Sequence, residues 1–315
     1  MANTLFEIAE KLKNREISAD SKEVKDIENI LIEMASTEDG RTEIAEVIGV
    51  YLQEQMNKID IAPLITDSKH FNFGDRPEFR LKKKGIKAYW IAPNSSTPKS
   101  KNYKETLNMD FETLSVRPEC LLDELKAGRI SSLQELLADG QEALRTAIVE
   151  KVFTILGQVY NEQGAGKDFT TVCTTGIDKA SLEKAIDAVT YRTGKNAVIL
   201  GDKTLTNQIM GFDGFAPEAN EEIRKNGTLG YFRGARIIGV NDVYDEALGK
   251  SLVPKDRLFI VSDKIGYSAT YGDAKTGQEN SIEDWSWNAR VDMEWGIAVT
   301  NPKANQVGGY LTMNN

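Results

Sequence analysis

The sequence RPEFRLKKKGIKAYWIA (Arg76–Ala92) and the sequence YKETLNMDFETLSV (Tyr103–Val116) enclose a polar segment, PNSSTPKSKN (Pro93–Asn102). Both outer runs are charged and strand-like, and the prolines and serines between them are typical of a turn. The pattern predicts a long hairpin with a polar tip. A lone two-stranded hairpin is at best marginally stable in water, so this one needs a partner surface, most simply another copy of the chain. The pattern therefore indicates a protein that assembles rather than one that catalyses.

A long amphipathic helix follows this hairpin. Ser132-Leu133-Gln134-Glu135 has the form of a capping box, and apolar residues then recur mostly every three or four positions as far as Tyr160. At 1.5 Å per residue such a helix spans roughly 43 Å, long enough to act as a beam. Gly140 interrupts the apolar stripe and predicts a slight bend or close packing there.

The remaining segments predict a mixed α and β fold. Met1–Met56 is helical in pattern, with a break at Ser36–Gly40. Its two apolar stripes fit either helices packed on the body or an arm that orders on a neighbour. Asn161–Thr175 is a glycine-rich loop. Beyond it the pattern predicts helices at Lys179–Tyr191 and Lys203–Met210 and strands at Ala197–Leu200, Ala235–Val240, Leu258–Val261, Tyr267–Tyr271 and within Ser281–Thr300.

Composition excludes several classes of protein. The net charge is −9, whereas a sequence-independent nucleic-acid binder carries a basic excess that neutralises phosphates. No apolar run approaches the length of a membrane span, and the N-terminus lacks the pattern of a secretory signal. Cys120 and Cys173 are the only cysteines, and we expect them to be reduced and buried, as in a cytosolic protein.

The charge is unevenly distributed along the chain. Residues 1–60 hold 7 Lys or Arg and 14 Asp or Glu, whereas residues 75–105 hold 9 and 3. Two solvated faces would explain this distribution. So would a basic hairpin that lies on an acidic surface of a neighbouring copy, since complementary charge sets register and encounter.

No motif in the sequence indicates catalysis. Gly164-Ala165-Gly166-Lys167 fails as a phosphate loop, because Asn161 stands where the first glycine belongs and Asp168 follows the lysine. In Gly201–Thr204, Asp202 is expected to cap a helix. His70 is the only histidine and is expected on the surface or in a loop. We therefore predict neither an enzyme, nor a metal site, nor a cofactor.

The four tryptophans divide into two groups. Trp285 and Trp287 stand two positions apart and are predicted to share one face of a strand in the core of a sheet. Trp90, near the hairpin tip, is a candidate anchor on a neighbouring copy, because tryptophan is enriched at interface hot spots.

The order of these parts resembles the HK97-fold major capsid proteins of tailed double-stranded DNA bacteriophages. The resemblance rests on the order and spacing of six stretches: Lys87–Pro98 (KAYWIAPNSSTP), Val116–Asp123 (VRPECLLD), Ala197–Met210 (AVILGDKTLTNQIM), Gly227–Asn241 (GTLGYFRGARIIGVN), Arg257–Ser262 (RLFIVS) and Trp295–Ala304 (WGIAVTNPKA).

This resemblance implies an α+β, HK97-like capsid fold. It divides the chain into an N-terminal helical arm (1–65), an extended β-hairpin called the E-loop with its flanking strands (66–117), a P domain with a long spine helix (118–170), an α/β A domain (171–280) and a return strand to the P domain with the C-terminus (281–315).

The resemblance also implies a function. The chain is expected to self-assemble into pentamers and hexamers of an icosahedral shell that encloses packaged double-stranded DNA, in a virion assembled in the host cytoplasm. Expected partners are its own copies, a separate scaffolding protein and a portal, with no membrane. The alternatives are an encapsulin-type nanocompartment shell and, more remotely, an α/β enzyme with a regulatory hairpin. Expected inter-subunit contacts lie on the E-loop: Arg80, Lys82, Lys83, Lys84, Lys87, Trp90, Lys99 and Lys101.

Overall fold

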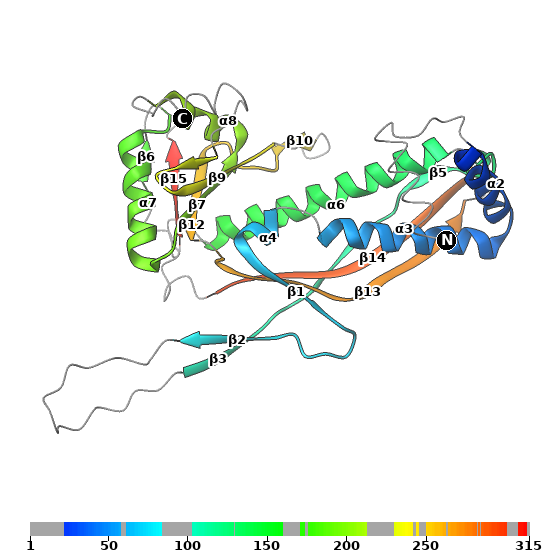
Figure 1. Cartoon of the computed structure of the whole chain (residues 1–315), viewed down its shortest axis with the longest axis horizontal. Coiled ribbons are helices and arrows are strands. Elements are labelled where there is room, and N and C mark those ends of the chain that lie inside the picture. The colour runs from blue at the N-terminus through cyan, green and yellow to red at the C-terminus, as the bar shows by residue number, and fades with distance from the viewer. Residues whose placement is uncertain are drawn as a thin grey trace, which may run out of the picture.

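The computed structural model describes residues 22–57, 61–83, 103–128, 130–159, 171–173, 176–212, 230–241, 244–245, 250–262, 264–281, 283, 285–300 and 308–313. These residues form a long body with a smaller lobe at one end, and a two-stranded hairpin leaves the body below that lobe (Figure 1). No helix in this part of the chain has both the length and the apolarity needed to cross a membrane.

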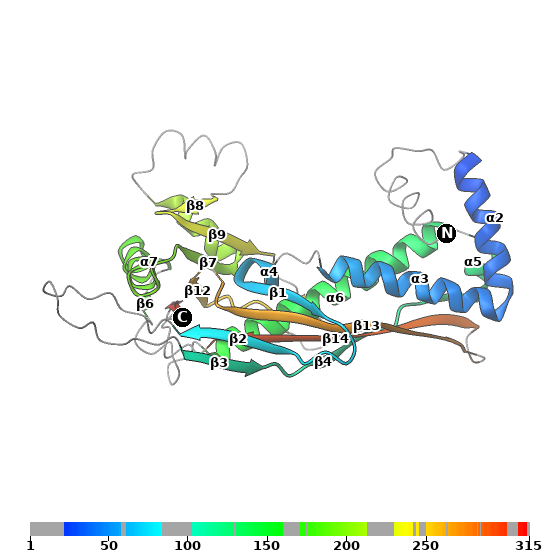
Figure 2. The ribbon, with the colours of Figure 1, turned by 60° about the horizontal axis from the view of Figure 1, so that its bottom comes forward.

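One sheet runs the length of the body. Its strands lie in the order β1 (Thr66–Phe71), β13 (Gly266–Asn280), β14 (Ser286–Val299) and β4 (Glu112–Val116), and β5 (Glu119–Leu121) also pairs with β14. The β1–β13 pair is parallel and the others are antiparallel. The β13–β14 pair is therefore the central element, and it reaches from the lobe to the opposite end of the body (Figure 2).

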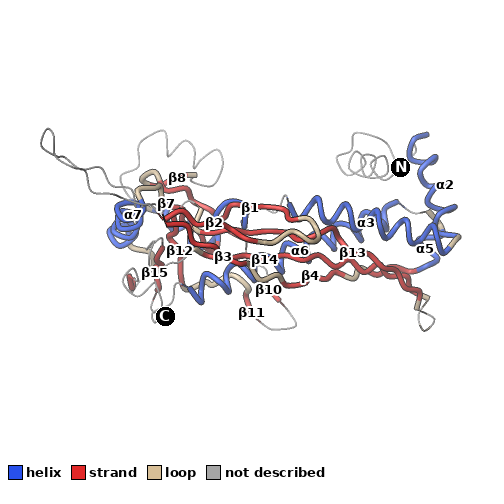
Figure 3. The backbone as a smooth tube through the Cα atoms, turned by 90° about the horizontal axis from the view of Figure 1, so that it is seen from below, coloured by secondary structure: helices blue, strands red, loops and turns tan. Residues whose placement is uncertain are grey.

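Helices cover one face of this sheet. α3 (Glu38–Asn57) and α6 (Ile130–Val159) run along it, α4 (Ile61–Ile65) leads into β1, and α2 (Lys22–Ser36) and α5 (Leu122–Lys126) pack together at the far end. Seen from below, the strands lie in front of the helices (Figure 3). The opposite side of the sheet, which we call the outer face, has no helix over it among the described residues.

Close packing holds α3 against the sheet. Ile44, Ile48 and Leu52, spaced one turn apart, are at most 2% exposed. A Cβ atom at Gly49 would lie 2.2 Å from Cγ2 of Thr276 on β13, so only glycine permits this approach. The two alternatives for the N-terminal helices are thereby decided for residues 22–57, which pack on the body. A break was predicted within Ser36–Gly40. It lies at the beginning of that range, because α2 ends at Ser36 and α3 begins at Glu38.

The lobe is built on a second sheet. Its strands lie in the order β6 (Thr171–Cys173), β15 (Gly308–Met313), β12 (Arg257–Ser262), β7 (Ala197–Asp202), β9 (Ala235–Val240) and β8 (Tyr231–Phe232). The flanking elements are α7 (Lys179–Thr193), α8 (Lys203–Gln208) and the 3-10 turn η2 (Ile209–Gly211), and β10 (Tyr244–Asp245) pairs with β11 (Lys250–Ser251) nearby. The helices and strands predicted here are confirmed, including the end of α7 at Gly194, which has a left-handed φ of 66°.

Three predicted elements differ from the structure. The strand predicted at Tyr267–Tyr271 is only the first part of the 15-residue β13. The return run Tyr103–Val116 is two strands, because β3 (Tyr103–Asn108) pairs with β2 (Glu78–Lys83) whereas β4 joins the body sheet. The long helix begins at Ile130, so the predicted capping box at Ser132 lies inside it.

The division into domains also differs from the predicted boundaries. β13 belongs to the body sheet, although it falls within the predicted A domain at 171–280. Residues 281–315 were predicted as a return strand with the C-terminus; β14 lies in the body sheet, whereas β15, near the C-terminus, joins the sheet of the lobe. The chain therefore crosses between body and lobe once more than the sequence indicated.

The prediction that Trp285 and Trp287 share a buried face is wrong. Trp287 is fully buried, and its indole Nε1 donates to Oε1 of Gln278 at 3.1 Å. Trp285 is 68% exposed and precedes β14, with a left-handed φ of 56°. Side-chain alternation holds only in extended backbone, and the turn at Trp285 breaks it.

These two tryptophans provide a matched test of the fold. We expect Trp287→Ala to lower the free energy of unfolding of the unassembled protein by about 3–5 kcal/mol, because it leaves a large cavity in the core. Trp285→Ala should change it by no more than about 0.5 kcal/mol, as is usual for an exposed side chain. Urea unfolding followed by circular dichroism measures both, and equal losses would contradict the burial described above.

Candidate assembly surfaces

The root of the hairpin is seated on the outer face of the body sheet. Phe79 of β2 is 1% exposed. Its ring stacks on Tyr267, with centroids 4.3 Å apart, and meets Phe71 edge-on at 5.4 Å. Met109 and Ala269 complete this cluster. The start of the hairpin is thus fixed within its own protomer.

Beyond this root, the two strands pair only with each other among the described residues. They lead away from the body sheet toward the end that carries the lobe (Figure 1). Within the ladder, Lys82 is the register partner of Lys104. A two-stranded ladder without a further partner is at best marginally stable in water.

Three of the eight predicted contact residues lie on described backbone. Arg80, Lys82 and Lys83 belong to β2. The other five, Lys84, Lys87, Trp90, Lys99 and Lys101, lie outside the described residues. Their contacts with another copy remain a prediction.

Charged side chains on the rest of the outer face neutralise one another. Asp292 accepts hydrogen bonds from Ser115 Oγ at 2.5 Å and Arg290 Nε at 3.0 Å, and the Arg290 bond lowers the pKa of the Asp292 carboxyl. Lys275 pairs with Glu294 at 3.0 Å. A face whose charges are already paired attracts a charged partner only weakly.

A second group of polar and charged contacts joins β4 and the end of β13 to their neighbours. Arg117 donates to Asn288 Oδ1 at 2.8 Å and forms an ion pair with Glu279. On the helix-covered side, Lys151 of α6 pairs with Glu112 of β4 at 2.6 Å. These contacts lock β4 and the end of β13 to the body.

The far end of the body carries a different surface, formed by β5, α5 and the residues before β14. Leu121 is 52% exposed and lies beside Trp285, because the Leu122 amide donates to the Trp285 carbonyl at 3.0 Å. Four carboxylates stand within three positions of Leu121 or Trp285 in the sequence. We call this surface the distal patch and define it as Glu119, Leu121, Asp123, Glu124, Glu283 and Trp285.

Cys120 reports the electrostatic character of the distal patch. Desolvation raises the pKa of its thiol to about 11, and the negative charges of Glu124 and Glu119 add to the effect. The thiol is half-buried and free, whereas Cys173 is buried and free. The predicted reduced state is consistent with this arrangement, but Cys120 is less buried than expected.

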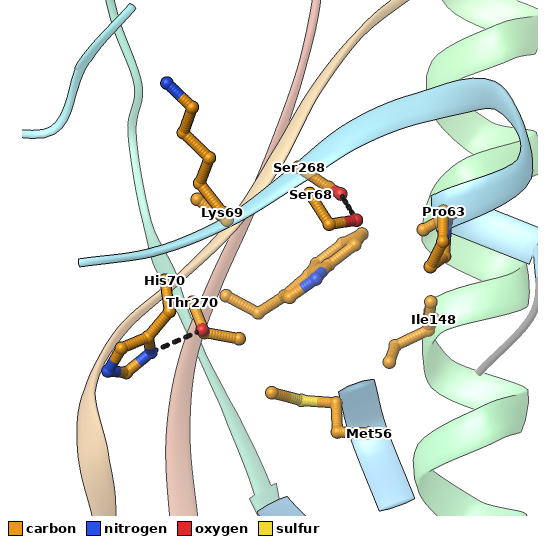
Figure 4. A pocket seen from close by; sticks show the side chains of 11 residues that line it. Met56, Pro63, Ser68, Lys69, His70, Ile148, Ser268 and Thr270 are labelled. Carbon is orange, nitrogen blue, oxygen red and sulfur yellow. Dashed lines mark hydrogen bonds between the residues drawn. The ribbon is translucent and has the colours of Figure 1, made fainter. Parts of the chain in front are cut away.

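A cavity of about 240 Å³ lies between the helices and the β1–β13 pair (Figure 4). The polar side chains of its lining form hydrogen bonds with each other. Ser68 Oγ lies 2.9 Å from Ser268 Oγ, and His70 Nδ1 lies 2.8 Å from Thr270 Oγ1. His70 is exposed on β1, as predicted. Among the residues that line this cavity, no serine is paired with the histidine in the way a nucleophile is paired with its base.

The other motifs considered for ligand binding are structural or lie outside the described residues. Asp202 Oδ1 accepts from the Thr204 amide at 2.7 Å, which confirms its role as the cap of α8. Gly164–Lys167 lies outside the described residues. Within the described part of the chain, no group of three or more His, Cys, Asp or Glu could hold a metal ion.

Comparison with known proteins identifies relatives of this architecture. A family model described as "SPbeta prophage-derived putative capsid protein YonB" matches residues 3–312. A comparison with curated proteins finds no match.

Solved structures share the fold at low sequence identity. A protein of Microbacterium phage Oxtober96 has a TM-score of 0.55 and 13% identity, over 81% of this chain and 93% of that chain. The capsid structure of cyanophage P-SCSP1u has a TM-score of 0.50 and 12% identity, over 79% and 86%. A virus-like particle from Pyrococcus furiosus has a TM-score of 0.51 and 12% identity, over 84% and 98%.

The electrostatics of the distal patch can be tested through Cys120. In a Cys173→Ser background, we expect Glu124→Gln to lower the Cys120 pKa and to speed its alkylation by iodoacetamide at pH 8 by about twofold to tenfold, because the thiolate is the reactive form. Glu54→Gln, which removes a carboxylate on α3, should leave the rate unchanged. Equal rates for all three proteins would contradict a negative potential at Cys120.

Proposed function

Since the chain belongs to the YonB family of prophage-derived capsid proteins, we propose that its copies form pentamers and hexamers that close into an icosahedral shell around packaged double-stranded DNA. The observation that carries this proposal is the hairpin: one aromatic cluster seats it at Phe79, and its strands then leave the body without a further partner among the described residues. A contact between copies would supply the missing stabilisation.

In this proposal each part of the molecule has a mechanical role. The β2–β3 hairpin is the E-loop, which lies over an adjacent subunit. α6 is the spine helix, and it forms the P domain together with the body sheet. The lobe is the A domain, which gathers at the centre of each pentamer or hexamer. The shell as a whole holds the DNA against its own repulsion.

The partners follow from the same proposal. The chain is a structural component of the phage virion, and assembly in the host cytoplasm is part of the proposal. Heterologous contacts, in which different surfaces of identical copies meet, generate closed rings. A portal completes the shell, and the DNA is enclosed without sequence-specific binding. The net charge of −9 suits a container better than a nucleic-acid-binding surface.

A second candidate is an encapsulin-type shell that encloses protein cargo. One observation favours it: the structure resembles the virus-like particle from Pyrococcus furiosus, and the alignment covers 98% of that protein's chain. The contents of purified shells distinguish the two: double-stranded DNA supports a phage capsid, whereas a co-purifying protein supports the alternative.

The hairpin tip provides the most direct test of assembly. We expect deletion of Asn94–Lys101 to abolish ordered shells, because it removes the segment proposed to rest on the neighbouring copy. The unassembled protein should still fold, since the cluster around Phe79 is untouched. Negative-stain electron microscopy measures assembly, and thermal unfolding measures the fold. Normal shells from the deletion variant would refute the role of the hairpin.

The need for a separate scaffolding protein is a further expectation. A separate scaffolding protein is part of the proposal, so we expect the chain expressed alone to give few or no shells of capsid size. Co-expression with the neighbouring genes of its prophage should increase the yield of such shells. Abundant shells of capsid size from the chain alone would contradict a scaffolding requirement.

A further inference from the structure

We propose that the distal patch of one subunit is the surface that receives the basic hairpin of a second copy. This inference rests on the proposed function and specifies which part of the neighbour the hairpin contacts. Trp285 is its apolar anchor, and the surrounding carboxylates of the distal patch draw in the lysines and arginines of the hairpin.

Trp285 is displayed and held in place. It is 68% exposed, and its left-handed φ of 56° is unusual for a bulky side chain. Hydrogen bonds on both sides maintain this turn: the Leu122 amide donates to the Trp285 carbonyl at 3.0 Å, and the Ser281 amide donates to the Ser286 carbonyl at 2.9 Å. A strained and solvent-facing tryptophan points to a function outside its own protomer, and tryptophan is typical of interface hot spots.

The charges of the two surfaces are complementary. Four described carboxylates, Glu119, Asp123, Glu124 and Glu283, stand within three positions of Leu121 or Trp285 in the sequence. The cations beside them are Lys126 and Arg117, which donates to Asn288, the register partner of Glu119. None of the four forms an ion pair with another described residue. Residues 75–105 of the hairpin carry nine basic residues against three acidic ones.

Two other surfaces are weaker candidates. The outer face of the sheet has already paired its charges within the protomer, for example Arg290 with Asp292. The exposed side of α3 carries several acidic residues, including Glu43 and Glu46, but Val50 is its only large apolar side chain with substantial exposure among the described residues. Among the described residues, the distal patch combines carboxylates that form no ion pair with an exposed aromatic side chain.

The arrangement of the body favours the same pairing. The distal patch lies at one end of the long axis, and the hairpin strands lead toward the other end (Figures 1 and 3). A hairpin that reaches the distal patch of the next copy makes a head-to-tail contact. Such heterologous contacts can repeat around a ring.

Charge reversal tests this pairing. Each variant of the full chain is co-expressed with the same neighbouring genes as the wild-type chain. We expect Glu119→Lys with Glu283→Lys, or Lys82→Glu with Lys83→Glu, to lower the yield of shells by about tenfold or more, because each places like charges at the contact. The four substitutions together should restore the yield to within about twofold of wild type. Thermal unfolding of each unassembled variant verifies that it still folds.

The rival acidic surface supplies the matched control. Glu43→Lys with Glu46→Lys reverses charge on α3 by the same amount. Each pair is combined with Lys82→Glu and Lys83→Glu. If the α3 pair restores shells and the distal-patch pair does not, the proposal is overturned in favour of α3.

Fluorescence tests the anchor itself. The difference between the emission of wild type and Trp285→Phe isolates Trp285, and we expect it to shift to shorter wavelength when shells form. Shells that assemble while Trp285 keeps the emission of a solvent-exposed indole would overturn the inference and leave the proposed function standing. Failure of the wild-type chain to form shells under every co-expression would instead overturn the proposed function together with this inference.

Discussion

The packing of α3 and α6 against one face of the β13–β14 pair is the constraint on which the rest of the molecule depends. The aliphatic side chains of both helices bury Trp287, Ala289 and Val291 beneath them, and the absent side chain at Gly49 lets α3 approach Thr276. Because both helices lie on the same side, the sheet has one buried face and one outer face. The outer face must then be either covered or polar.

The chain uses both solutions on the outer face. Near β1 the aromatic cluster of Phe71, Phe79 and Tyr267 covers the sheet, and this cluster also fixes where the hairpin leaves the body. Farther along, charged side chains form pairs such as Lys275 with Glu294. Exposed pairs of this kind contribute little to stability, but they keep the outer face soluble. In the proposed assembly, the contacts between copies are made at the two ends of the body.

Local pattern was enough to predict the elements whose apolar residues face one core. The helical spacing in α6 and α7 and the continuous apolar runs of β7 and β12 are of this kind, as is the pairing of the hairpin strands. β13 was shortened in the prediction because its second half, GDAKTGQEN, has little apolar character. Pairing with β14 and contact with α3 hold that half in place, and these are tertiary effects that no local window contains.

Of the two surfaces in the proposed contact, only the basic hairpin could be predicted from the sequence. The basic hairpin is continuous in sequence, so its charge and turn residues were visible. The distal patch joins segments more than 150 residues apart, Glu119–Glu124 and Glu283–Trp285, and becomes one surface only because β5 pairs with the start of β14. The left-handed backbone at Trp285 could not be inferred from alternation, which assigned that residue to the core.

The separation of charge from apolar anchoring suits a shell built from many identical contacts. Complementary charge speeds encounter and sets register but adds little net affinity, whereas a single buried aromatic side chain can carry much of the binding energy. A contact with one anchor is individually weak, so a misplaced subunit can dissociate and rebind. Once a ring closes, each subunit is held by several such contacts at once, and multivalency makes the closed assembly far more stable than any pair. The proposed placement of two complementary surfaces at opposite ends of an elongated body permits this.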